Sequence, residues 1–206
     1  MSDSNATPTV NADVAIIGAG PAGLMAAEVL SRAGLAVHLF DAMPSVGRKF
    51  LLAGKGGMNL THAEPLDSFV TRYGAAQSRV QALLQHWGPQ AVRDWAAGLG
   101  IETFVGTSNR VFPTDMKAAP LLRAWLHRLR HPGEGGVPVV FHMRHRWQGW
   151  GDSTGGSLVF RGPSGPVQVE ARATLLALGG ASWARLGSDG AWLPWLQAAG
   201  VAVSPL

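Results

Sequence analysis

The apolar and polar positions of the first forty residues predict a strand, a helix and a second strand. Ala12–Ile17 is a short apolar run rich in β-branched residues and is ended by a glycine, as a buried strand is. Pro21–Ala33 carries apolar residues at helical spacing, begins with a proline and meets Gly34 as its stop. Leu35–Phe40 is a second apolar run, and it ends at Asp41. Strand, glycine turn, helix and strand within about thirty residues make one βαβ unit.

The pattern changes after this unit. Met43–His62 is a glycine-rich loop without a lasting period, apart from one helical turn near Arg48–Leu52. Helical spacing returns in Gln77–Trp87, Pro89–Leu99, Lys117–Leu129 and Asp189–Ala199. Short strands are predicted at Ile101–Val105 and Arg110–Phe112, and antiparallel strands at Val137–Arg146, Ser157–Phe160 and Val167–Glu170. Ala173–Leu178 predicts a further buried strand, and Val201–Val203 begins another.

Composition places the chain among folded proteins. Hydrophobic residues make up 47% of the 206 positions and charged residues 15%, so most of the chain can be buried in a core. No apolar run approaches the roughly 18–20 residues that span a bilayer, so no membrane partner is expected. Residues 1–11 are polar and lack a basic start, which predicts a disordered tail rather than a signal peptide. The absence of cysteine excludes disulfides, thiolate metal ligands and cysteine catalysis, and the cytoplasm is the expected compartment.

The formal charge of +4 comes mainly from arginine, which supplies 14 of the 17 basic residues. Several arginines lie between Arg123 and Arg146, among four histidines. A basic patch of this kind attracts nucleic acid or an anionic substrate. The alternative is an arginine-rich composition on solvated faces, which we favour because no stacked-aromatic or recognition-helix pattern accompanies it. The sequence therefore does not favour nucleic acid as a partner.

The turn after the first strand reads G-x-G-x-x-G in its full strand–turn–helix context. Gly18 permits a tight turn, Gly20 lets the backbone approach a pyrophosphate, and Gly23 lets the helix pack on the strand. The acidic residue at the end of the second strand, Asp41, accepts hydrogen bonds from the adenosine ribose and argues against the 2′-phosphate of NADP. The predicted dinucleotide site thus comprises Gly18, Ala19, Gly20, Pro21, Ala22, Gly23, Asp41 and its neighbour Ala42. This fingerprint alone does not separate FAD from NAD.

Other motifs make the chain similar to a known family over about residues 12–206. They are Gly47-Arg48-Lys49-Phe50, Gly54-Lys55-Gly56-Gly57-Met58-Asn59, Asn109-Arg110-Val111-Phe112-Pro113, Ala177-Leu178-Gly179-Gly180-Ala181-Ser182 and Leu186-Gly187-Ser188-Asp189-Gly190. The last three match the family's G-R-V-F-P, A-T-G-G-x-S and T-G-S-T-G-D-G. The chain resembles the bacterial BaiN-like/YhiN-like flavoproteins, often labelled NAD(P)/FAD-dependent or aminoacetone-oxidase-like oxidoreductases.

The resemblance implies FAD as the cofactor and adds site residues. It implies that Arg48 and Lys49 lie along the ribose and pyrophosphate, and that a glycine loop runs toward the phosphates and the ring system. The loop residues are Gly56, Gly57, Met58 and Asn59, and Ala177, Gly179 and Gly180 complete the set. The alternatives are an exposed basic loop for Arg48 and Lys49 and a turn residue for Asn59.

The chain also departs from the family. Met58 stands where many members have cysteine, while Leu178 and Leu186 replace threonine. His62 is a candidate acid or base, but a lone loop histidine is more often solvated, which is the interpretation we favour. No paired carboxylates, serine–histidine pair or metal-ligand spacing suggests another mechanism, so no side chain is nominated as catalytic and no metal is expected.

These inferences predict a doubly wound, Rossmann-like α/β FAD-binding domain over residues 12–200, with an inserted antiparallel β segment at about residues 137–170. Residues 201–206 are expected to begin a second domain, so the chain is expected to be truncated relative to the family. Ala173–Leu178 would then have an unpaired edge for a partner chain or a dimer to cover.

The predicted function is a two-electron flavin oxidoreductase acting on a small-molecule substrate, with NAD(P)H as a candidate donor. The alternatives are a dinucleotide-binding protein without turnover, an inactive flavoprotein fragment, and a flavoprotein that acts on nucleic acid.

Overall fold

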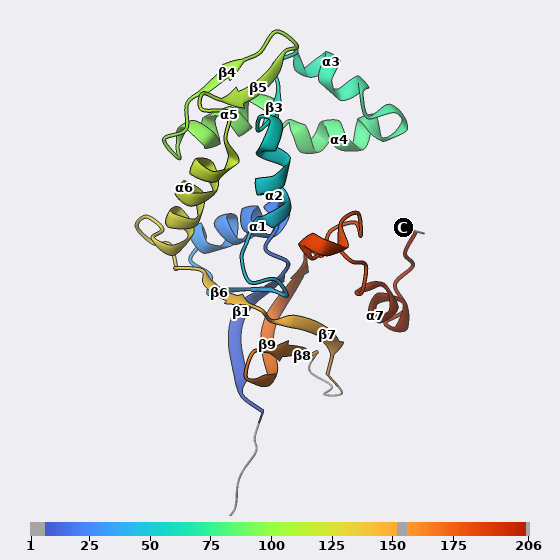
Figure 1. The fold of residues 1–206 in the computed structure, drawn as a ribbon. Coiled ribbons are helices and arrows are strands. Elements are labelled where there is room, and N and C mark those ends of the chain that lie inside the picture. The colour runs from blue at the N-terminus through green and yellow to red at the C-terminus, as the bar shows by residue number, and fades with distance from the viewer. Residues whose placement is uncertain (1–6, 152–155, 205–206) are drawn as a thin grey trace, which may run out of the picture. The chain divides into compact units, whose positions relative to one another are not determined.

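The computed structural model describes residues 7–151 and 156–204, and the chain forms two compact units. The first unit comprises Met1–Lys49 and Leu129–Leu206, and the second comprises Phe50–Arg128. Figure 1 labels their elements. Within the described ranges, no helix combines the length and the hydropathy that a membrane crossing requires.

The first unit contains a six-stranded sheet of order β6-β2-β1-β9-β8-β7. The strands are β1 (Thr9–Ile17), β2 (Val37–Asp41), β6 (Val140–Met143), β7 (Arg146–Trp150), β8 (Leu158–Gly162) and β9 (Gly165–Leu176). Strands β6, β2, β1 and β9 are parallel, whereas β9, β8 and β7 pair antiparallel. The helices of this unit include α1 (Pro21–Arg32), the short η3 (Ala184–Leu186) and α7 (Leu193–Ala198). The predicted α/β class is confirmed, and an antiparallel segment is present in β7, β8 and β9.

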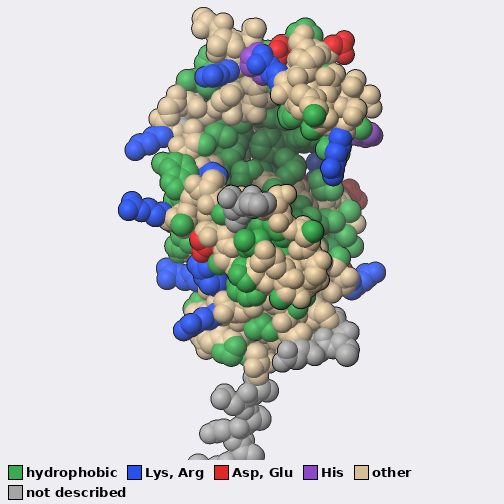
Figure 2. All heavy atoms as spheres, turned by 90° about the vertical axis from the view of Figure 1, so that its right-hand side faces the viewer, with side chains coloured by type: hydrophobic (Ala, Val, Ile, Leu, Met, Phe, Trp, Pro, Cys, Tyr) green, Lys and Arg blue, Asp and Glu red, His purple; other side chains and the backbone are tan. Residues whose placement is uncertain are grey.

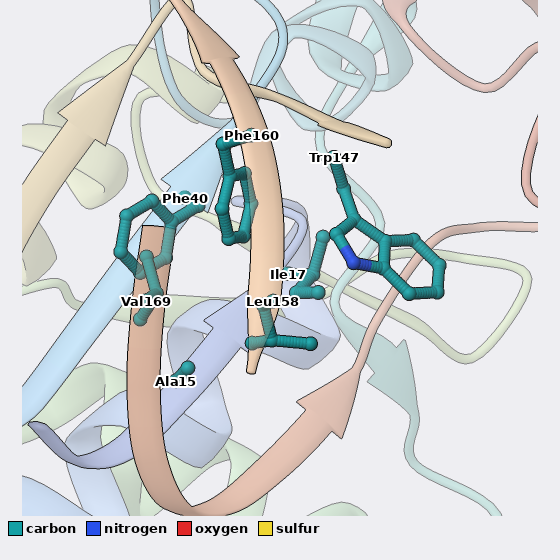
Figure 3. Close-up of a cluster of buried hydrophobic side chains, with 7 residues drawn as sticks. All are labelled: Ala15, Ile17, Phe40, Trp147, Leu158, Phe160 and Val169. Carbon is teal, nitrogen blue, oxygen red and sulfur yellow. The ribbon is translucent and has the colours of Figure 1, made fainter. Parts of the chain in front are cut away.

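Alternation along the central strands gives the sheet two apolar faces. Successive side chains of a strand point to opposite faces, so Ile16 and Leu39 face away from Ile17 and Phe40. Helix α1 lies against β1 and β2. The other face carries a buried cluster drawn from β1, β2, β7, β8 and β9, namely Ala15, Ile17, Phe40, Trp147, Leu158, Phe160 and Val169 (Figure 3). Each large side chain buried here stabilises the fold by about 1.5–3 kcal/mol.

The second unit is built from short helices and a three-stranded antiparallel sheet of order β3-β5-β4. Its elements are η1 (Gly54–Gly56), β3 (Thr61–His62), α3 (Leu66–Thr71), η2 (Gly74–Ala76), α4 (Gln77–Leu84), α5 (Pro89–Ala97), β4 (Thr103–Val105) and β5 (Arg110–Pro113). The chain passes between the units within α2 (Arg48–Ala53) and α6 (Ala118–Arg130). The buried Trp125 of α6 packs edge-on against Trp95, with ring centroids 4.8 Å apart. This aromatic contact joins α5 to α6.

The prediction of an antiparallel strand over Val137–Arg146 is wrong. The segment is divided into β6 and the start of β7, and β6 pairs parallel with β2, with His38 opposite Val140. After α6 the backbone N–H of Val137 bonds to the carbonyl of Ser31 and that of Val139 to Leu129. These bonds place the segment after α6 beside β2, on the side opposite β1. Strand β6 therefore runs parallel to β2.

Three other predictions need correction. Val167–Glu170 and Ala173–Leu178 are parts of one strand, β9, and Ala173 and Thr174 are exposed rather than buried. The tail prediction is wrong for residues 9–11, which belong to β1 and pair with β9, while residues 1–6 lie outside the described residues. Val201–Val203 is not a strand. Strand β9 continues through its exposed residues because their backbone groups pair with β1. Backbone hydrogen bonding therefore extends the strand where side-chain burial does not.

The edge of β9 is paired only in part. Residues 165–169 pair with β8, whereas the register with β8 does not extend to residues 170–176. Those later residues pair with β1. Within the described part of the chain, the expected unpaired edge is therefore present over residues 173–176.

A stack of rings lies where β2 meets β6. The His142 ring lies on Phe40 with centroids 4.3 Å apart, and its Nε2 is 3.1 Å from Nδ1 of His38. Burial, followed by the charges of His38 and His145, lowers the pKa of His142 to about 4. Burial also lowers the pKa of His38. In the described ranges, no group of three or more His, Cys, Asp or Glu side chains is arranged to hold a metal ion.

We expect acid to weaken the fold between about pH 6.5 and pH 4 through His142. Over this window the unfolded chain binds a proton that the folded chain does not, so the free energy of unfolding falls as the pH falls. For this half-buried group, after discounting for solvent screening, the loss is about 1–2 kcal/mol. Urea unfolding at several pH values measures it. His142→Phe keeps an aromatic ring on Phe40 and should make the free energy of unfolding depend less on pH. An unchanged pH dependence in this variant would assign the loss of stability to other groups.

Candidate functional site

The glycine turn joins β1 to α1 with almost no intervening chain. β1 ends at Ile17, and α1 begins with Pro21 as its first residue. Gly18 has a φ of 110°, a conformation that favours glycine, and its N–H donates to the carbonyl of Phe40 over 2.8 Å. The turn is thus bonded to the end of β2.

The three glycines meet different surroundings. A Cβ at Gly18 would lie 2.2 Å from the carbonyl oxygen of Ala177, and one at Gly23 would lie 1.9 Å from that of Gly18. A Cβ at Gly20 would meet nothing within 4 Å. Gly18 and Gly23 are therefore required by packing, whereas Gly20 keeps the space in front of the turn open.

That space lies at the start of a twelve-residue helix whose N-terminus is not capped. Gly20 offers no side chain, and the first turn contains no acidic residue. The free N–H groups of such a turn and the helix dipole together favour an anion. Ala19 is buried, while Pro21 and Ala22 are exposed beside the opening. The turn has the form of a phosphate site.

Asp41 lies at the carboxyl end of β2, next to the turn. Its Oδ2 accepts the N–H of Ala19 and its Oδ1 that of Met43, both over 2.7 Å. Burial raises the pKa of Asp41, although these two N–H groups and the charges of Arg48 and Arg146 oppose the rise. Each carboxylate oxygen retains a lone pair, so the group can still accept from ribose hydroxyls. The hydrogen bonds fix its orientation.

The two predicted basic residues differ in environment. Arg48 is partly buried, and its Nε is fully buried without a hydrogen-bond partner among the described residues. Lys49 is exposed, and its Nζ donates to Oγ of Ser182 over 2.5 Å. An unpartnered guanidinium N–H beside a phosphate-type turn fits an anionic ligand. Lys49 ties the start of α2 to the loop that follows β9.

The loop after β9 lies beside the glycine turn. The N–H of Ala177 donates to the carbonyl of Ile17 over 2.8 Å, and the backbone of Ala177 is what a Cβ at Gly18 would strike. Gly179 has a φ of 73°, and a Cβ there would lie 2.7 Å from Oγ of Ser188. Gly180 is exposed, and a Cβ there would meet nothing within 4 Å. Segments that are about 160 residues apart thus contribute to one site, as expected for a doubly wound sheet.

The predicted loop Gly56–Asn59 belongs to the second unit and is described there by itself. Gly57 has a φ of 113°, and a Cβ there would lie 2.6 Å from Cε of Met116. The N–H of Met58 donates to the carbonyl of Met116 over 3.1 Å, and the Met58 side chain is buried. A Cβ at Gly56 would meet nothing within 4 Å, and Asn59 is exposed. The loop thus packs at Gly57 and Met58 against Met116, and at Gly57 also against the Phe112 side chain of β5.

His62 is also in the second unit, at the end of β3. Its Nδ1 lies 3.3 Å from both the N–H and the Oε1 of Glu64, and Glu64 forms a two-point ion pair with Arg72. His62 is therefore partly buried and engaged with its neighbours rather than fully solvated.

A depression beside Asp41 was not predicted from the sequence. Its cavity volume is about 70 Å³, below the roughly 300–1,000 Å³ of a typical site that encloses a whole ligand. Its walls include Gly18, Asp41, Ala42, Arg146, Trp147, Leu178, Asp189, Trp192 and Trp195. Arg146 and Asp189 form an ion pair with Nη1 and Oδ2 2.9 Å apart, which joins β7 to the segment before α7. Only tertiary contacts bring these residues together, and no local signal marks Trp147 or Trp192.

A phosphate-type turn between the first strand and helix, with an acidic residue at the end of the second strand, defines the class of Rossmann-type dinucleotide-binding proteins. The chain belongs to the HI0933-like family, whose Rossmann-domain profile matches residues 12–206. This is an FAD-binding flavoprotein family, and the cofactor of the chain is FAD. The uncapped helix, the open space at Gly20 and the unpartnered Nε of Arg48 fit the ADP half of that cofactor.

Individual relatives match shorter stretches. The chain is 47% identical over 49 residues to the ribosomal RNA dihydrouridine synthase of Haemophilus influenzae, a match that covers 24% of this chain and 12% of the relative. Among solved structures, it is similar to the apo Sdh1 complex of Mycobacterium smegmatis, with a TM-score of 0.66, 16% identity, and 93% of this chain and 39% of that chain covered. It is also similar to a 3-ketosteroid dehydrogenase of Rhodococcus jostii, with a TM-score of 0.58, 19% identity, and 87% and 48% covered. The chain thus spans less than half the length of these relatives.

Proposed function

We propose that the chain is the FAD-binding part of an oxidoreductase that reduces or oxidises a small-molecule substrate by two electrons, with NAD(P)H as the electron donor. The observation that carries the proposal is the open space at Gly20, in front of an uncapped helix and beside Asp41. When bound, the flavin supplies the two-electron chemistry.

The residues of the chain would divide the binding of FAD between them. The N–H groups at the start of α1 would hold the pyrophosphate, and Arg48 would add a charged hydrogen bond from its unpartnered Nε. Asp41 would accept from the adenosine ribose while Ala19 and Met43 keep its carboxylate oriented. The loop at Ala177 would close the site on the side of β9.

Anaerobic titration of the FAD-loaded chain with NADH and with NADPH tests the proposal. Loss of the flavin absorption band on addition of either nucleotide is the expected result. A chain that holds FAD with the expected stoichiometry, but whose flavin is reduced by dithionite and by neither nucleotide, would instead be a binding protein or would use another donor.

A base in RNA is a second candidate substrate. It is favoured by the name of the Haemophilus influenzae relative, which modifies ribosomal RNA. On the face shown in Figure 2, however, the Lys and Arg side chains are scattered rather than gathered into one patch, and Arg146 is paired with Asp189. We therefore place the small-molecule substrate first.

Incubating the FAD-loaded chain with NADPH and a uridine-containing RNA separates the two candidates. Mass spectrometry of the digested RNA would reveal two added hydrogens per reduced base. RNA retention that disappears with modest salt, without any added hydrogen, would indicate electrostatic attraction alone.

A further inference from the structure

A larger cavity lies entirely within the second unit, among β3, α3, α4 and the start of α5 (Figure 1). Its volume is about 340 Å³, whereas that of the depression beside Asp41 is about 70 Å³. The larger volume falls within the roughly 300–1,000 Å³ of sites that enclose a small molecule. None of the lining residues belongs to the predicted cofactor site, so this cavity has no assigned ligand.

Arg93 supplies the cavity with a positive charge. It is a partly buried residue of α5, which packs against β3 and β4, and its Nε donates to Oγ1 of Thr103 over 3.4 Å. Within the described ranges, its two Nη groups have neither a hydrogen bond nor an ion pair. A guanidinium that is held at Nε with both Nη groups free can bind an anionic group at two points.

His62 offers a hydrogen-bond donor to the same cavity. Its Nδ1 accepts the N–H of Glu64 over 3.3 Å, which leaves the ring proton of the neutral form on Nε2. When the ring is protonated, Nδ1 instead donates to Oε1 of Glu64, also 3.3 Å away, and Nε2 still carries a proton. The two-point ion pair with Arg72 holds this carboxylate in place. Nε2 is therefore a donor in both forms of the ring.

The remaining lining residues define the kind of anion that fits. The charge of Glu64 is offset by Arg72, so Arg93 remains as the uncompensated permanent charge among the lining residues. One such charge matches a carboxylate better than a phosphate, which carries nearly two. Leu66 at the start of α3 and Leu84 at the end of α4 add apolar walls. A ligand that suits both parts has one carboxylate and a short apolar body.

We propose that this cavity is a binding site for a small organic monocarboxylate. Arg93 and Nε2 of His62 bind the carboxylate, and the apolar body lies against Leu66 and Leu84. The proposal uses none of the residues assigned to FAD, so it does not depend on the cofactor. It gives the second unit a ligand of its own.

NMR titration of the ¹⁵N-labelled full chain with hexanoate, in the presence of FAD, tests the proposal. We expect saturable shifts of the backbone N–H signals of residues 61–66 and 84–93, which surround the cavity. Hexanamide has the same body without the charge, and it should bind about tenfold more weakly, the loss typical of one charged hydrogen bond. Acetate should also bind more weakly than hexanoate, because it lacks the methylene groups that the leucines would cover.

Three variants assign the binding to individual side chains. Arg93→Gln removes the charge but keeps an N–H for Thr103, and it should weaken hexanoate binding by about tenfold or more. Arg79→Gln is the matched control, because it removes an exposed arginine of α4 that does not line the cavity, and it should bind like the parent. His62→Asn keeps an acceptor for the N–H of Glu64 but lacks Nε2, and it should weaken binding by about three- to tenfold. Urea unfolding checks that each variant retains the fold.

Hexanoate shifts that are absent, or that map outside the cavity, would overturn the proposal. Equal affinity of the parent chain for hexanoate and hexanamide would overturn it as well, and this comparison does not depend on any variant. Tighter binding of inorganic phosphate than of hexanoate would assign the cavity to a phosphorylated ligand instead. None of these results bears on the cofactor, because FAD binding is measured by a separate titration.

Discussion

Replacing Gly20 with valine is expected to weaken FAD binding by about 100-fold or more, through loss of two or more phosphate hydrogen bonds of roughly 1.5–3 kcal/mol each. A Cβ at this position meets nothing within 4 Å, so the branched side chain would occupy the open space in front of α1. The backbone of Gly20, with φ −80° and ψ −179°, is one that valine adopts readily. The free energy of unfolding should therefore stay within about 1 kcal/mol of the parent value.

FAD titration by fluorescence and urea unfolding measure the two effects separately. Gly133→Val is the matched control, because a Cβ at Gly133 also meets nothing within 4 Å and no ligand is expected there. Gly23→Ala should instead lower the free energy of unfolding, by about 3 kcal/mol, because its Cβ would lie 1.9 Å from the carbonyl oxygen of Gly18. Parent-like FAD affinity in Gly20→Val would place the phosphate site elsewhere.

Asp41→Asn is expected to weaken ADP binding by about 1–3 kcal/mol, or roughly 5–150-fold, and to remove discrimination between ADP and its deoxyribose analogues. Asparagine has one acceptor oxygen where Asp41 has two, and both oxygens of Asp41 already accept a backbone N–H, from Ala19 and Met43. One of these N–H groups would lose its acceptor, and the ribose would meet a neutral group. We expect a further loss of about 1 kcal/mol in the free energy of unfolding.

The discrimination is what assigns Asp41 to the ribose. Calorimetry with ADP, 2′-deoxy-ADP and 3′-deoxy-ADP should show a penalty for at least one analogue in the parent chain, and none in Asp41→Asn. Asp115→Asn provides a control, because Asp115 also accepts a backbone N–H, that of Lys117, away from the glycine turn. Equal penalties in parent and Asp41→Asn would leave Asp41 a structural role in orienting the turn.

The β1–α1–β2 unit could be predicted closely because its signals are local. The apolar run before Gly18, the proline at the start of α1 and the acidic end of β2 each act through neighbours a few residues away. The helical turn near Arg48 was also predicted, as α2. Of the glycines in the turn of this unit, Gly18 and Gly23 have a conformation or contacts that other residues do not tolerate, so their positions are visible in the sequence.

The pairing of the later strands could not be predicted in the same way. A short apolar run such as Val140–Met143 has the same pattern in a parallel and in an antiparallel pair, and only its neighbour β2 decides the direction. Likewise, Val167–Glu170 and Ala173–Leu178 are predicted as two separate strands, yet pairing with β1 continues from one to the other. The helix expected from Asp189 begins only at Leu193, because the Asp189 side chain bonds instead to Arg146 and to the N–H of Ala191.

The class of fold and the places of the glycine turn and of Asp41 could therefore be predicted from the sequence, since each depends on residues that act within one βαβ unit. Tertiary structure alone decided what surrounds them. The contact of Ala177 with Gly18 and the depression lined by Trp147 and Trp192 join segments far apart in the chain. The physical reason is that hydrogen bonding and burial of a side chain depend on partners brought near by the folded sheet, and no spacing along the chain records them.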